Sequence, residues 1–296
     1  MSEDTETKGS LLLAWQVKDK HCLVIGSGNV ALSRIVHLVR ANAKITVITG
    51  EGNIDPEILQ LNEQGKIFKL ISRNYQPSDL TMYEDSNLNL KNLDLDNLSP
   101  EVYEKIDNYV YNQRFETVCC CIDDYDTSLK VYYQCKLLKL NVNIADKPKY
   151  CDFYFGSMYN QKNLQIMVST NGKSPRLSKI VKDRIAKEFD DIDLNKAVEN
   201  LGFIRSRLKI HVPINENDFE SIEDRMNWVK TLTDFFSLRQ WSELDLIPSN
   251  EDNKYIYVDN IVKYFPDFPP NDFEEFKKIL PIIDPDFEIG KLSIKD

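Results

Sequence analysis

A pair of glycines between two apolar segments limits what this chain can fold into. Residues 22–34 read CLVIGSGNVALSR, where Gly26 and Gly28 separate an apolar run from a pattern with helical spacing. This order predicts a strand, a tight turn and the start of a helix. The first glycine permits the turn, the second lets a pyrophosphate approach the backbone, and the helix start offers free N–H groups. The spacing G-x-G-x-x-A, completed by Ala31, favours dinucleotide binding.

The segments around the glycines support this interpretation. Residues 21–25 and 44–49 are expected to form buried strands, and residues 29–40 the helix between them. Glu51 follows the second strand, about 20 positions after the glycines, where a carboxylate accepts hydrogen bonds from a ribose diol. Considered alone, Glu51 fits a solvated loop. Joined to the glycines it favours NAD over NADP, because a carboxylate repels a 2′-phosphate.

Composition excludes several classes of protein. A net charge of −10 argues against nucleic-acid binding, and no apolar run is long enough to span a membrane. The acidic, polar N-terminus resembles neither a secretory signal nor a transit peptide, so a cytoplasmic protein is expected. The six cysteines include no C-x-x-C pair and are expected to be free core thiols, and the three histidines lack zinc-ligand spacing. Any metal chemistry must therefore rely on carboxylates or on nitrogen atoms of the substrate.

The first half of the chain alternates strands and helices, which predicts an α/β fold with a doubly wound parallel sheet. Further strands are expected at 11–17, 67–71, 117–122 and 142–145, and helices at 56–64 and 129–140. Residues 76–107 look like an acidic surface insertion with one helix near 100–109. Ligands bind such sheets beyond the carboxyl ends of the strands. That edge receives loops 26–30, 49–51 and 121–124, and Asp146.

The second half changes character. Residues 153–157 and 164–169 are expected to form a hairpin joined by a turn at 159–163, followed by a helix from Pro175 to about residue 189. That helix carries a basic cluster of Arg176, Lys179, Lys182 and Arg184, which fits a solvated helix face and a polyanion site equally well. Helical spacing returns at 194–209, 218–236 and 271–280.

Three sequence blocks carry a resemblance to a known family. They read NIADKP at 143–148, FYFG at 153–156 and NGKSPR at 171–176. With the glycine turn and residues 201–207, they make the chain resemble the bifunctional precorrin-2 dehydrogenase / sirohydrochlorin ferrochelatase of siroheme synthesis, in its short fungal form without a methyltransferase. The resemblance covers nearly the whole chain, and the blocks after Ala145 are more specific than the glycine motif.

The resemblance implies three domains and a homodimer. They are an NAD-binding Rossmann-like domain at 1–145 with the insertion at about 76–107, a central α+β dimerisation domain at 146–192 and a helical domain at 193–296. It implies NAD-dependent oxidation of precorrin-2 to sirohydrochlorin, then insertion of Fe²⁺, which is a substrate held by the pyrrole nitrogens. The first reaction gives up a hydride and a proton, and the second releases two protons, so a carboxylate base suits both.

The expected site residues follow. Asp146 is implied to serve both reactions as proton acceptor, although by itself it would fit a turn cap or a partner for Lys147. The expected cofactor contacts are Gly26, Gly28, Asn29, Val30, Thr49, Gly50, Glu51, Cys121 and Ile122. Lys173, Arg176 and Lys179 are candidates for binding the carboxylates of the tetrapyrrole, with Arg207 a weaker one.

Two other functions stay open from the residues alone. The chain fits a dehydrogenase for another class of small molecule, although the few histidines count against a histidine base. It also fits a non-catalytic NAD-binding dimeric sensor.

Overall fold

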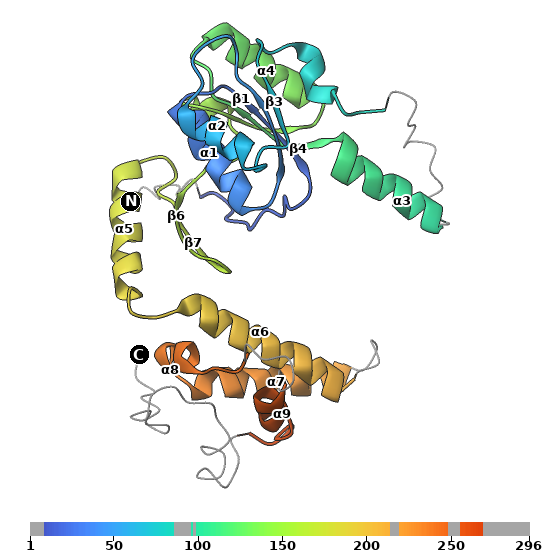
Figure 1. The fold of residues 1–296 in the computed structure, drawn as a ribbon, viewed down its shortest axis with the longest axis vertical. Helices are drawn as coiled ribbons and strands as arrows, with labels where there is room; N and C mark the ends of the chain where they lie inside the picture. Colours follow the sequence, from blue (N-terminus) through green and yellow to red (C-terminus); the bar gives the residue numbers. More distant parts are fainter. Residues whose placement is uncertain (1–8, 86–95, 97–98, 214–218, 248–254, 269–296) are drawn as a thin grey trace, which may run out of the picture. The chain divides into compact units, whose positions relative to one another are not determined.

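The computed structural model describes residues 9–85, 96, 99–213, 219–247 and 255–268 (Figure 1). These residues form two compact units, which divide between Phe155 and Gly156. No helix within the described ranges combines the length and apolar content needed to span a bilayer.

The first unit is built on a parallel sheet (Figure 1). Its strands are β1 (His21–Ile25), β2 (Lys44–Ile48), β3 (Lys69–Ile71), β4 (Phe115–Cys120) and β5 (Asn141–Ile144). Their order is β3-β2-β1-β4-β5, and every neighbouring pair is parallel. The chain starts at the centre, builds out to one edge and returns to build the other, so its direction reverses between β1 and β4. The predicted doubly wound sheet is confirmed.

Helices cover both faces of this sheet. Helices α1 (Asn29–Arg40) and α2 (Pro56–Glu63) pack on one face and α4 (Tyr125–Leu137) on the other (Figure 1). The helical spacing of Ala31, Ile35 and Leu38 brings all three onto the sheet side of α1. Helix α3 (Pro100–Asn108) buries no residue. The described part of the unit also contains three short helical turns: η1 (Pro77–Thr81), η3 (Tyr109–Gln113) and η4 (Pro148–Tyr150).

The second unit begins with the predicted hairpin. Strands β6 (Ser157–Gln161) and β7 (Leu164–Val168) are antiparallel, and α5 (Pro175–Glu188) packs against them. Helices α6 (Leu194–His211), α7 (Phe219–Phe235), α8 (Leu238–Glu243) and α9 (Ile256–Val262) follow. The last four share a core that contains Trp228, Leu232 and Trp241. The helices expected at 194–209 and 218–236 are confirmed, whereas the one expected at 271–280 lies outside the described residues.

The strand expected at residues 11–17 is wrong. This segment is irregular, and Leu11 is 82% exposed. It is held by side chains instead of strand pairing: Trp15 Nε1 donates to Glu116 Oε1 (2.8 Å) and its ring packs edge-on against Phe153 (5.2 Å between centroids). In this segment Trp15 and Val17 pack individually, whereas Leu11, Leu12 and Leu13 are exposed.

The hairpin begins later than expected. Phe153 and Phe155 pack against the core beneath α1, so β6 starts only at Ser157 and the turn shortens to residues 162–163. Helix α4 begins earlier than expected, because Asp124 Oδ1 accepts a hydrogen bond from the Thr127 N–H (2.8 Å) and caps it.

The start of the expected surface insertion is part of the core. Asp79 and Leu80 in η1 are each 1% exposed, and Leu80 belongs to the hydrophobic cluster beneath α4. Residues 86–95 and 97–98 of that segment lie outside the described residues.

We predict that His21 makes the stability of the first unit depend on pH. Burial lowers the pKa of His21 from 6.5 to about 4, with a smaller contribution from the Lys44 ammonium. Between these values the unfolded chain binds a proton that the folded chain does not, so stability falls as the pH decreases from 6.5 to 4. Urea unfolding across this range should show a shallower fall for His21→Phe than for the wild type. Identical slopes would contradict the assignment.

Candidate functional site

Hydrogen bonds continue beyond the ends of the strands and fix the carboxyl edge of the sheet. The Cys121 N–H donates to Ile25 O (2.7 Å), and the Ala145 N–H donates to Cys120 O (2.8 Å). These bonds keep the ends of β1, β4 and β5 aligned. Asp146 directly follows Ala145, whose N–H is bonded to Cys120, so these bonds fix the position of Asp146 beside the end of β4.

The two glycines of the first loop have different structural roles. Gly26 has φ 123°, and a Cβ there would lie 2.4 Å from the carbonyl oxygen of Cys121. Gly28 precedes α1 as its N-cap, and a Cβ there would have no atom within 4 Å. The first N–H groups of α1, from Asn29 and Val30, have no acceptor within the helix. The result is an open backbone cradle, which fits a pyrophosphate group.

The second loop is tied to the first by Ser27, a residue that the sequence did not single out. The buried Ser27 hydroxyl donates to Thr49 O (3.0 Å). Thr49 is 5% exposed, Gly50 has φ 76°, and Glu51 lies exposed beyond them. The carboxylate of Glu51 is therefore available at the end of β2, next to the loop that begins α1.

Asp146 lies exposed in a tight turn after β5. The Lys147 N–H donates to Ile144 O (3.3 Å), and Asp146 itself has φ 57°, a left-handed conformation that aspartate tolerates. Among the described residues, none forms a hydrogen bond or ion pair with its carboxylate. The Lys147 ammonium instead lies over the Tyr125 ring, 5.8 Å from its centroid. The pairing with Lys147 that would have given Asp146 a purely structural role is not formed.

The other expected cofactor contacts, Cys121 and Ile122, directly follow β4. Burial raises the pKa of the Cys121 thiol to about 12, and the Asp146 carboxylate contributes to the shift. Cys121 is thus a neutral thiol near pH 7, suited to packing and not to nucleophilic chemistry. Ile122 packs against the core beneath α4. Cys22, Cys119, Cys120 and Cys135 are buried free thiols, as expected, whereas Cys121 and Cys151 are only partly buried.

The expected substrate contacts belong to the second unit. Lys173, Arg176 and Lys179 are exposed in the turn before α5 and in its first turns. Arg207 is occupied elsewhere: its guanidinium donates to both carboxylate oxygens of Asp259, at 2.8 Å each, and joins α6 to α9. Within the described ranges, no three His, Cys, Asp or Glu side chains come together as metal ligands.

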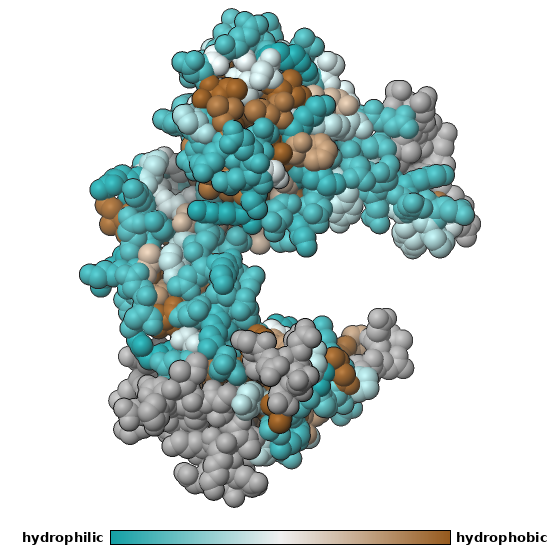
Figure 2. All heavy atoms as spheres, viewed as in Figure 1, coloured by the Kyte–Doolittle hydropathy of each residue, from teal (hydrophilic) through white to brown (hydrophobic). Residues whose placement is uncertain are grey.

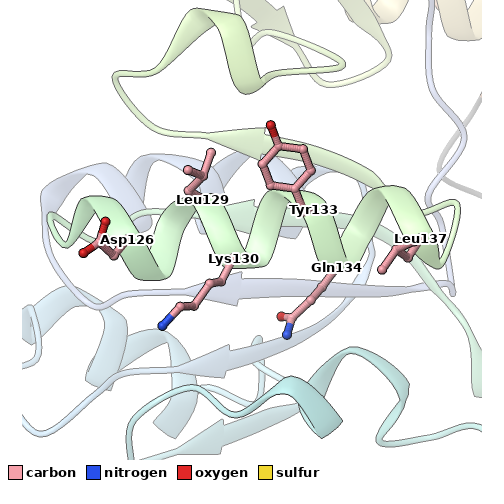
Figure 3. A pocket seen from close by; sticks show the side chains of 6 residues that line it. All are labelled: Asp126, Leu129, Lys130, Tyr133, Gln134 and Leu137. Carbon is pink, nitrogen blue, oxygen red and sulfur yellow. The ribbon is translucent and has the colours of Figure 1, made fainter.

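A shallow hollow of about 400 Å³ lies on the outer face of α4. In Figure 3, Leu129 and Tyr133 point to one side of the helix and Lys130 and Gln134 to the other. Asp126 and Leu137 complete its lining, so it contains none of the expected site residues.

Three family models match successive parts of the chain. The family described as "Putative NAD(P)-binding" matches residues 13–157. "Sirohaem biosynthesis protein central" matches residues 161–188, and "Sirohaem biosynthesis protein C-terminal" matches residues 191–248.

Individual relatives agree with these matches. A siroheme biosynthesis protein of Saccharomyces cerevisiae is 33% identical over 80% of this chain and 87% of its own length. A siroheme biosynthesis protein of Schizosaccharomyces pombe is 29% identical over 91% of this chain and 84% of its length. A siroheme synthase of Thioalkalivibrio sulfidiphilus is 26% identical, but only 34% of it is covered. The solved structure of "SirC, precorrin-2 dehydrogenase" is similar with TM-score 0.45 and 17% identity, over 74% of this chain and 88% of that one.

We predict that alanine affects the two glycines differently. Gly26→Ala places a Cβ against the Cys121 carbonyl in a left-handed conformation and should lower the free energy of unfolding by about 2 kcal/mol or more. Gly28→Ala has φ −90° and open space, so the loss should stay below about 1 kcal/mol. Urea unfolding of both variants measures the difference. Equal losses would mean that the close approach at Gly26 does not constrain the loop.

Proposed function

The chain belongs to the siroheme biosynthesis protein family, and from this premise we propose that it oxidises precorrin-2 to sirohydrochlorin with NAD and then inserts Fe²⁺ to form siroheme. The observation that carries the proposal is the arrangement at the carboxyl edge of the sheet. Asp146, an exposed carboxylate without a partner among the described residues, follows β5 on the same edge as the open cradle at Gly28. A carboxylate base and a nucleotide site at the same edge of the sheet suit a reaction in which the nucleotide accepts a hydride and the base accepts a proton.

The oxidation divides between the cofactor and the chain. NAD supplies the hydride acceptor when it is bound. The backbone cradle of α1 would hold the pyrophosphate, and Glu51 would accept hydrogen bonds from the ribose diol. Asp146 would accept the proton that leaves the macrocycle. Because its carboxylate is exposed, it can pass that proton to solvent and be ready for the next step.

Metal insertion also requires a group that accepts protons. Two pyrrole protons leave as Fe²⁺ enters, and the ring nitrogens become the ligands. Asp146 would accept these protons one after the other. The same carboxylate can thus serve two reactions without a change in the fold.

We further propose that the cofactor is NAD and not NADP. Glu51 is exposed at the end of β2, where a 2′-phosphate would approach its negative charge. Tighter binding of NADP than of NAD would contradict this preference.

Replacing Asp146 tests the shared base. Asparagine tolerates the left-handed conformation, so Asp146→Asn removes the charge while keeping the turn. Because a general base contributes roughly 100-fold or more, both rates should fall by at least about that factor. The measurement is the absorbance change of precorrin-2 with NAD, and of sirohydrochlorin with Fe²⁺. Near-normal rates in either assay would exclude Asp146 as the proton acceptor of that step.

Gly28→Asp separates the two reactions. The cradle has open space for the new side chain, but its carboxylate would occupy and repel the position of the pyrophosphate. Oxidation should be lost, whereas chelation should continue at a rate close to that of the wild type. Loss of both activities in a folded variant would show that chelation also needs the nucleotide cradle.

We also propose that two copies of the chain associate through the hairpin and α5. In residues 156–192 no hydrophobic side chain is buried, and Leu177, Ile180 and Val181 on α5 are 51%, 51% and 40% exposed. Figure 2 shows apolar patches among the hydrophilic surface along α5. A lone hairpin with one helix rarely forms a stable fold, so a second copy would provide the missing core.

Leu177→Asp tests this association. Light scattering should give twice the chain mass of 34.4 kDa for the wild type and a shift toward 34.4 kDa for the variant. Leu137→Asp is the matched control, because Leu137 on α4 is 84% exposed and lies in the other unit. A monomeric wild type, or equal effects of both substitutions, would contradict the proposed interface.

A further inference from the structure

Arg73 lies next to the loop in which the ribose would be bound. Its carbonyl oxygen accepts a hydrogen bond from the Gly50 N–H (3.1 Å), and the Thr49 N–H donates to Ile71 O (3.0 Å). The ends of β2 and β3 are therefore joined past the strands themselves. The main chain of Arg73 is thereby held beside Gly50, the residue that precedes Glu51.

The guanidinium of Arg73 makes three hydrogen bonds, two of them to the Asp79 carboxylate. Its Nη1 and Nη2 donate to the two carboxylate oxygens of Asp79 at 2.8 and 2.5 Å, and Nη1 also donates to Asn74 O at 2.9 Å. The Asp79 side chain is only 2% exposed, and it also accepts a hydrogen bond from the Gln76 N–H (2.7 Å). The short helix η1 thus presents a fixed carboxylate to the arginine.

An arginine near the ribose is what NADP-binding sites use to hold a 2′-phosphate. The planar fork of Arg73 would suit that phosphate, but Asp79 occupies the fork and cancels its charge. A phosphate that displaced Asp79 would leave a buried carboxylate unpaired, which is strongly unfavourable. On the basis of the proposed nucleotide binding, we infer that Asp79 is a specificity-determining residue, which excludes NADP by keeping Arg73 occupied.

The test titrates the full-length protein with NAD and with NADP by calorimetry. Asp79→Asn removes the charge but keeps an oxygen that can cap η1. Because a charge-assisted hydrogen bond is worth enough to change a binding constant roughly tenfold, the Kd of NADP should fall about tenfold. The Kd of NAD should stay within about threefold, since its diol does not need Arg73.

Three further variants show whether Arg73 is responsible. Adding Arg73→Gln to Asp79→Asn should abolish the gain in NADP affinity. Asp259→Asn, which breaks a similar arginine–aspartate pair in the second unit, should produce no gain. Arg73→Gln alone keeps an amide that can donate to Asp79, and it should leave NADP affinity unchanged, which checks the inference independently of Asp79→Asn.

Failure of this inference can be distinguished from failure of the proposed function. A folded Asp79→Asn variant that binds NAD but gains no NADP affinity would overturn this inference alone. A gain that survives Arg73→Gln, a gain in Asp259→Asn, or a tenfold loss in Arg73→Gln alone would also overturn it. A wild-type protein that binds neither nucleotide would overturn the proposed function together with the inference.

Discussion

The close approach of β1 and β4 at their carboxyl ends is the constraint on which the candidate site depends. Gly26 passes so near the Cys121 carbonyl that no side chain fits between them. This contact lies where the direction of the chain reverses, between the two halves of the sheet. Main-chain hydrogen bonds beyond the strands then extend the alignment to Thr49 and Ala145. The positions of the cradle, of Glu51 and of Asp146 thus follow from the backbone, and their side chains remain available to a ligand.

Much of the first unit could be predicted because its signals are local. A buried apolar run, a glycine turn and helical spacing define β1 and α1, and both were predicted with the bounds that the structure has. Residues 11–17 and 153–157 were mistaken for strands because apolar side chains look the same whether they pair in a sheet or pack singly. Trp15, Phe153 and Phe155 do the latter, and only the tertiary fold decides between the two.

The sequence pointed to candidate site residues where one short motif or block carries them, as at Gly26, Gly28 and Asp146. Their roles in binding and catalysis stay predictions. Ser27 and the Arg73–Asp79 pair were missed, because their roles arise from contacts between loops that only the sheet brings together. Asp79 also lies in a polar segment that looked like a surface insertion, and no local pattern distinguishes a buried aspartate there.

The turn that carries Asp146 also limits how this position can drift during evolution. Its left-handed main chain is comfortable for asparagine and glycine but strained for longer side chains. Glutamate, the nearest chemical substitute, therefore meets a conformational penalty, while the two easiest replacements both lack an acid. Given the role proposed for Asp146, a descendant that keeps the fold but loses the activity is expected to carry asparagine or glycine at this position.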